Sequence, residues 1–229
     1  LPSMPRALER LPLHPALWRG GALARPSRPG VPTGYPALDE RLPGGGWPRG
    51  ELAEFLVEGR GIGELALLAP ALARLTRAGE AAALIAPPHL PYAPAWAARG
   101  IELSRLAVLR PPARLDALWA MEQCLRSGAF GAVLAWLEIG EARFLRRLQL
   151  AAEAGGAFGA LYNARALPAS PAPLRLRLSC EGGRLRLDIL KRRGAPAGAL
   201  LLDIAGHALD RDPSPGPPPA SPLPRGVPA

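Results

Sequence analysis

The sequence is poor in the residues that build disulfide frameworks and metal sites. Only two cysteines, Cys124 and Cys180, occur among 229 residues, and neither has the CxxC or HxxxH neighbours of a metal site. No apolar run approaches the roughly 20 residues that span a bilayer, and the first residues lack the apolar stretch of a signal peptide. These absences predict a cytoplasmic protein with no membrane segment, no disulfide framework and no bound metal.

Lysine is almost absent too. Lys191 is the only lysine among 28 basic residues, and the formal net charge is +9. A basic balance favours nucleic acid or another polyanion as a partner. However, a chain rich in arginine, alanine, glycine and proline is also typical of GC-rich coding, which raises the arginine content whatever the function. The charge alone therefore does not establish a nucleic-acid partner.

The length suits one domain with appendages. We expect an N-terminal arm and linker at 1–30, a core domain at 31–205 and a disordered proline-rich tail at 206–229. Trp18 in the arm is a candidate contact for a partner protein, although docking onto its own domain would explain it as well.

Strand and helix patterns alternate through the core. Four segments predict helices, of which 113–126 places Leu115, Leu118, Met121 and Leu125 on one face. Repeated strand–helix units imply right-handed crossovers and a mostly parallel, twisted sheet with helices on both faces. The predicted strands are 52–57, 81–86, 106–109, 132–136 and 159–162, and the predicted helices are 64–77, 94–99, 113–126 and 141–154.

The C-terminal edge of this α/β sheet should carry an antiparallel hairpin. Apolar and charged residues alternate on both sides of Gly182-Gly183, a two-residue turn. The register places Leu178 opposite Leu187 and Arg177 opposite Asp188, and 200–204 is a last strand candidate. The basic residues of this region form either a surface for DNA phosphates or an acidic partner, or equally a plain solvated face. They are Arg175, Arg177, Arg184, Arg186, Lys191, Arg192 and Arg193.

A glycine-rich segment, Glu58-Gly59-Arg60-Gly61-Ile62-Gly63-Glu64-Leu65, lies between the first strand and the first long helix. A working phosphate loop reads G-x-x-x-x-G-K-[ST]. Here Glu58 replaces the first glycine, Glu64 the lysine and Leu65 the hydroxyl residue. A carboxylate about 4 Å from a phosphate oxygen is repelled by about 4 kcal/mol at an effective dielectric near 20. We expect no nucleotide in the usual pose; a plain glycine turn is the alternative interpretation.

The residues before this turn resemble the RecA-type recombinase core. The resemblance rests on two phrases, Pro32-Thr33-Gly34-Tyr35-Pro36-Ala37-Leu38-Asp39 and Gly44-Gly45-Gly46-Trp47-Pro48-Arg49-Gly50-Glu51-Leu52. It implies that the turn is a vestigial phosphate loop. It also implies that Pro88 stands in place of the glutamate that activates water, and Trp136 in place of the magnesium-associated aspartate. We therefore expect that the protein is not an enzyme and that it has no catalytic residues and no cofactor.

Among RecA-like proteins without a catalytic site, the chain is most similar to the ImuA family. The similarity covers Gly61-Ile62-Gly63-Glu64-Leu65, Ala86-Pro87-Pro88-His89-Leu90-Pro91-Tyr92-Ala93-Pro94 and Leu190-Lys191-Arg192-Arg193-Gly194. It implies a cytoplasmic accessory factor of DNA-damage-induced translesion synthesis in the SOS response. The implied partners are an ImuB-like Y-family protein and an error-prone polymerase subunit, with RecA and DNA as further candidates.

Two other functions stay open. A cell-division inhibitor of the SulA type is another RecA-like protein without a phosphate loop, and it would bind the division protein FtsZ. A nucleotide hydrolase with relocated catalytic residues would draw on the acids Glu58, Glu64 and Glu138, with Arg60 as the nearest cation. His89 has no carboxylate neighbour in the sequence, so we expect a structural role for it.

Overall fold

The computed structural model describes residues 29–57, 63–164, 167–194 and 198–204. Its strands are β1 (Leu52–Val57), β2 (Ala81–Ile85), β3 (Leu106–Leu109), β4 (Phe130–Trp136), β5 (Phe158–Asn163), β6 (Leu174–Glu181), β7 (Arg184–Lys191) and β8 (Gly198–Leu202). Its helices are α1 (Pro36–Asp39), α2 (Glu64–Arg77), α3 (Ala93–Ala98), α4 (Arg114–Arg126) and α5 (Ala142–Gly155), with a 3₁₀ turn η2 at Leu103–Arg105. Most predicted boundaries therefore agree within one or two residues.

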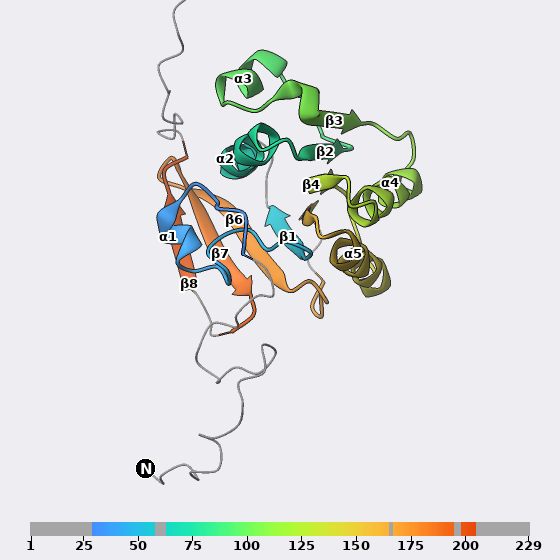
Figure 1. The fold of residues 1–229 in the computed structure, drawn as a ribbon. Helices are drawn as coiled ribbons and strands as arrows, with labels where there is room; N and C mark the ends of the chain where they lie inside the picture. The colour runs from blue at the N-terminus through green and yellow to red at the C-terminus, as the bar shows by residue number, and fades with distance from the viewer. Residues whose placement is uncertain (1–28, 58–62, 165–166, 195–197, 205–229) are drawn as a thin grey trace, which may run out of the picture.

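The described strands form one sheet in the order β3-β2-β4-β5-β1-β6-β7-β8 (Figure 1). Strands β1 to β6 pair in parallel, whereas β6–β7 and β7–β8 pair antiparallel. The predicted fold class is confirmed: the sheet is mostly parallel, has an antiparallel C-terminal edge and is consistent with a RecA-like fold. Leu178 pairs with Leu187 and Arg177 with Asp188, so the predicted hairpin register is confirmed too.

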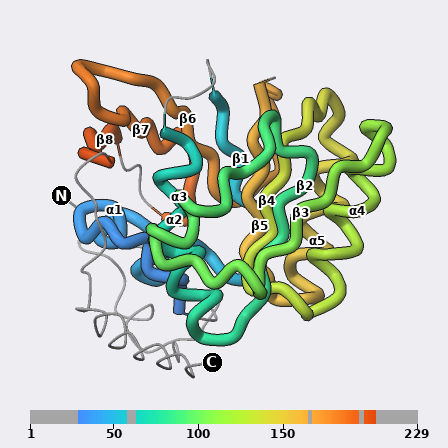
Figure 2. The backbone as a smooth tube through the Cα atoms, turned by 90° about the horizontal axis from the view of Figure 1, so that it is seen from above, coloured from blue at the N-terminus to red at the C-terminus, as the bar shows by residue number. Residues whose placement is uncertain are grey.

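Helices cover the two faces of the sheet and bury a separate core on each side. Figures 1 and 2 show α2 and α3 on one side and α4 and α5 on the other. The first core contains Leu67, Leu72 and Trp96, and the second contains Met121 and Leu148. Side chains of one strand alternate between these cores because successive residues point to opposite faces.

The segment that resembles RecA before β1 docks onto α2. The Thr33 backbone N–H donates to the Asp39 carboxylate at 2.8 Å, which closes the chain around α1. Gly34 has φ +88°, and a Cβ at this position would lie 2.5 Å from the Cβ of Pro70 in α2. Tyr35 donates its hydroxyl to the Ala66 carbonyl at 3.3 Å. The threonine–glycine and leucine–aspartate phrases thus fix the helix that follows the glycine turn.

Only part of the expected apolar face of α4 is covered. Met121 and Leu125 are fully buried, and Leu118 is half-buried. Leu115 is 64% exposed because it lies in the first turn, beyond the sheet, and Trp119 one turn later is 63% exposed. The sequence pattern therefore overstated how much of this helix the domain buries.

The predicted division into arm, core and tail stays a prediction. Residues 1–28, which contain Trp18, and the tail at 206–229 lie outside the described residues. Within the described ranges, no helix is long and apolar enough to cross a membrane.

Candidate functional site

The glycine turn joins the carboxyl end of β1 to the first turn of α2. Glu58, Gly59 and Gly61 lie outside the described residues. Gly63 precedes α2 with φ +97°, and a Cβ there would lie 1.8 Å from Cδ1 of Ile204. Ile204, which follows β8, therefore packs directly on Gly63, and the positive φ of this residue favours glycine.

Glu64 and Leu65 begin α2. Glu64 is 8% exposed and Leu65 packs against the first core. A carboxylate in the first turn of a helix interacts favourably with the helix dipole. Glu64, which we predicted to replace a phosphate-binding lysine, is thus an acid held close to the protein interior.

A row of aromatic rings lies beside the first residue of α2. Trp136, Tyr162 and Phe55 pair directly across β4, β5 and β1. The Trp136 and Tyr162 rings stack with centroids 4.8 Å apart, and the Tyr162 and Phe55 rings with centroids 5.1 Å apart. The Tyr162 hydroxyl donates to the Glu64 carbonyl at 2.9 Å. Trp136, which we predicted to replace a magnesium-associated aspartate, is therefore part of the packing that holds α2.

Pro88, which we predicted to replace a water-activating glutamate, lies half-buried in the loop after β2. Ala86 in the same loop has φ +50°, which is unusual outside glycine, and its N–H donates to the Leu109 carbonyl at 2.9 Å. His89 is exposed. Among the residues that the structure describes, no three or more histidine, cysteine or acidic side chains gather where they could hold a metal.

The predicted basic surface is split along the hairpin. Leu178 pairs with Val57, the last residue of β1, so the tip with Arg184 and Arg186 projects past the carboxyl end of the parallel strands. Arg175 and Lys191 pair at the other end of the hairpin, about 20 Å away along the strand at about 3.3 Å per residue. The structure does not bring these side chains into one patch.

At the tip, the charges are largely paired within the hairpin. Arg186 contacts Glu181 at 2.8 Å and Asp188 at 3.1 Å. Arg177 is exposed opposite Asp188, and Arg184 is exposed opposite Glu181. Contact with DNA or a partner stays a prediction for these arginines.

At the base, the basic side chains contact the domain itself. Lys191 donates to the Ser170 carbonyl at 2.9 Å, and burial, followed by repulsion from Arg175, lowers the pKa of its ammonium. Arg193 pairs with Glu51 at 3.0 Å. Arg192 donates to the backbone carbonyl of Arg41. These contacts fasten the end of β7 and the residues after it to the loop before β6, to the chain after α1 and to the amino end of β1.

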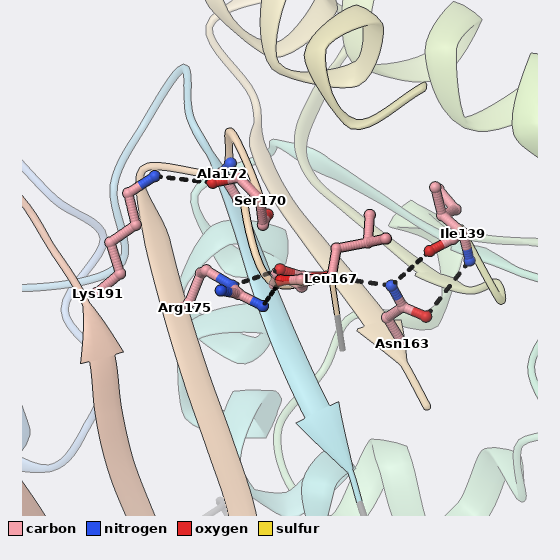
Figure 3. A network of polar contacts seen from close by, with 8 residues as sticks. Ile139, Asn163, Leu167, Ser170, Ala172, Arg175 and Lys191 are labelled. Atoms are coloured by element: carbon pink, nitrogen blue, oxygen red, sulfur yellow. Dashed lines mark hydrogen bonds and ion pairs between the residues drawn. The ribbon is translucent and has the colours of Figure 1, made fainter. Parts of the chain in front are cut away.

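Arg175 belongs to a buried polar network that sequence reasoning missed (Figure 3). Its Nε contacts the Glu54 carboxylate at 2.7 Å, with Glu54 0% and Arg175 12% exposed at the side chain. The Asn163 amide nitrogen donates to Glu54 at 3.1 Å. Arg175 also donates to the Leu167 carbonyl at 2.8 Å. The available signal was a single carboxylate in the otherwise apolar strand β1.

The same network fixes the loop after β4. The Asn163 side chain accepts from the Ile139 N–H at 3.3 Å and donates to the Ile139 carbonyl at 3.2 Å (Figure 3). One buried asparagine thus connects β5 to the backbone between β4 and α5. Its role could not be read from the sequence, because the contacting atoms belong to the backbone.

Comparison with known proteins gives one partial likeness. No protein-family model matches the chain. A stretch of 97 residues is 35% identical to the cell division inhibitor SulA of Edwardsiella piscicida. The stretch covers 42% of this chain and only 58% of that protein. The finding supports a distant, SulA-like relationship over part of the chain, and it does not single out the ImuA family.

We predict that Arg175→Leu lowers the free energy of unfolding by about 3–5 kcal/mol, because it leaves Glu54 buried without its cation. The double variant Glu54→Leu/Arg175→Leu should lose much less, since both charges are gone. Urea denaturation measures both, with Arg143→Leu as a control on an exposed ion pair. Equal losses in Arg175→Leu and in the control would contradict a stabilising role of the buried pair.

We predict an alkaline loss of stability that depends on Tyr162. Burial, and then the nearby Glu64, raise the pKa of this phenol well above its ordinary value of 10.0. The folded protein holds the proton more tightly than the unfolded chain, so the stabilisation is complete below pH about 10 and disappears above it. Tyr162→Phe should cost about 1 kcal/mol at neutral pH through the lost hydrogen bond.

The readout is the denaturation midpoint at a series of pH values. Midpoints of the Tyr162→Phe protein should fall less steeply above pH about 10 than those of the parent chain. Tyr35, whose pKa burial also raises, accounts for a residual slope in both proteins. Identical slopes in the two proteins would show that the pKa of Tyr162 does not differ between the folded and unfolded states.

Proposed function

We propose that the chain is a non-catalytic RecA-like accessory protein of a DNA-damage-induced translesion synthesis complex. It acts through contacts with other proteins and with DNA. The partners we propose are an ImuB-like Y-family protein and an error-prone polymerase subunit, with RecA as a further partner. The SulA-like relationship supports an SOS-related role in the coarser sense only.

The observation that carries the proposal is the aromatic row beside the glycine turn. A magnesium–phosphate site needs open, polar space at the carboxyl end of the strands. Here the Trp136 and Tyr162 rings stack with centroids 4.8 Å apart, and the Tyr162 hydroxyl donates to the Glu64 carbonyl at 2.9 Å. This packing supports a turn that is retained for folding. A protein of this kind works through its surface.

A SulA-type cell-division inhibitor is the second candidate. It is favoured by the 35% identity over 97 residues, which runs over only 58% of the inhibitor. In that case the partner is the division protein FtsZ, and no polymerase component is required. A nucleotide hydrolase would instead reveal itself by micromolar binding of ATP with magnesium in calorimetry.

The test is co-purification of the tagged full chain from cells exposed to DNA damage. We expect the Y-family-like protein and the polymerase subunit to be recovered with it. An Asp188→Lys variant, which is altered only on the hairpin, tests whether this edge of the sheet contributes to binding of the partners. Recovery of FtsZ without any polymerase component would reverse the ranking of the two functions.

Contact with DNA has its own prediction, which concerns the hairpin tip. Arg184→Glu should weaken binding of a fluorescent single-stranded oligonucleotide at least tenfold at fixed salt, because phosphate contacts by arginine dominate such affinities. Arg146→Glu is the matched control, since it makes the same charge change at an exposed position on α5. Equal weakening by both variants would mean that only net charge matters, and it would remove the tip as a specific contact.

A further inference from the structure

A second feature of the sheet edge lies on the opposite face from the aromatic row. A cleft of about 210 Å³ opens at the carboxyl end of β4, between the first turns of α4 and α5. Its apolar walls include Leu115, Leu118 and Phe144, and its rim includes Glu138 and Glu141. In open α/β sheets, binding sites occur outside the carboxyl ends of the strands. The cleft therefore lies where binding sites occur in sheets of this class.

The backbone that lines the cleft is held in place. Asn163 binds both the N–H and the carbonyl of Ile139 (Figure 3). The Leu137 N–H donates to the Tyr162 carbonyl at 3.2 Å, and Arg114 donates to the Glu138 carbonyl at 2.9 Å. A binding site whose backbone is already ordered loses less entropy when it binds.

The size of the cleft decides between kinds of ligand. Sites for cofactors and other small molecules usually enclose about 300–1,000 Å³, so 210 Å³ suits a single side chain better. Apolar surface continues along α4 from Leu115 at the cleft, which is 64% exposed, to Trp119 outside it, which is 63% exposed. Exposed apolar surface of this kind marks contacts with other proteins, and tryptophan is enriched where such contacts are strongest.

The charge at the rim specifies the partner further. The chain carries a formal net charge of +9, yet the rim presents exposed carboxylates of Glu138 and Glu141. Two cations lie nearby: Arg143 pairs with Glu141 at 2.8 Å and lies over the Phe144 ring at 4.8 Å, and Arg114, which lines the cleft, donates to the Glu138 carbonyl. Glu138 accepts from Arg114 through its backbone carbonyl, and among the described residues its exposed carboxylate has no ion-pair partner.

We propose that this cleft binds a segment of a partner protein that inserts one leucine- or phenylalanine-sized side chain between α4 and α5. An adjacent lysine or arginine of that segment pairs with Glu138. The inference rests on the proposed function only in that both assign the chain to protein–protein contacts. It names a surface and a ligand chemistry that the co-purification of a complex does not test.

The experiment selects random displayed peptides on the purified full chain. Enriched peptides should carry a large apolar residue next to lysine or arginine, and their affinities are then measured by fluorescence anisotropy. Leu115→Asp and Glu138→Lys should each weaken binding at least tenfold. The matched controls, Leu150→Asp on an exposed part of α5 and Glu40→Lys beside α1, should change it less than twofold.

A charge swap separates recognition from misfolding. Peptides whose basic residue is replaced by glutamate should bind the Glu138→Lys protein better than the parent chain, which an unfolded variant could not do. Circular dichroism confirms that each variant is folded. Enrichment of acidic peptides, no enrichment, or binding that Leu115→Asp leaves unchanged would each overturn the proposal.

A second copy of the chain is the other occupant that the experiment can reveal. A dimer in analytical ultracentrifugation that dissociates on Leu115→Asp would assign the cleft to self-association and overturn a partner peptide. Failure of the peptide selection leaves the translesion complex testable by co-purification, and loss of that complex leaves the peptide result intact. The two proposals can therefore fail separately.

Discussion

The structure depends on the row of rings that Phe55, Tyr162 and Trp136 form across the carboxyl ends of three central strands. Phe55 and Tyr162 are buried on the α2 face of the sheet, and the partly buried Trp136 stacks on Tyr162. The Tyr162 hydroxyl then holds the first turn of α2 through the Glu64 carbonyl. Because the glycine turn leads into that helix, its end is set by the aromatic row and by Ile204, which packs on Gly63. The region that would hold a nucleotide in a RecA-type enzyme is thus organised by apolar packing.

The same strands carry a buried polar network on their other face. Residues 54 and 55 of β1, like residues 162 and 163 of β5, point to opposite sides of the sheet because the side-chain period of a strand is two. The side chains of Glu54 and Asn163 therefore lie on the face of the sheet opposite to those of Phe55 and Tyr162. Arg175 ties β6 to β1 through Glu54, and Asn163 fixes the loop beside the cleft. The sheet edge beside the cleft is thus ordered by contacts that come from three different strands.

Local patterns were sufficient for most of the fold. Helix α2 and strand β3 have the bounds that periodicity predicts, and the hairpin register follows from alternation around Gly182-Gly183. Such features depend on neighbouring residues, whose preferences survive in a single sequence. Patterns were less sufficient where distant segments meet. The sequence grouped the basic residues of the hairpin as one candidate surface. The register instead separates Arg184 from Arg175, and Arg175 is buried against Glu54.

The sequence by itself determined the order of strands and helices along the chain and the antiparallel edge of the sheet. Glycine, alternation and apolar periodicity act over a few residues, so they are legible without the fold. Only the tertiary structure decided what Trp136 and Glu54 do, because their partners come from other strands. It also decided that Leu115 stays exposed, since a helix face is buried only where the sheet extends beneath it.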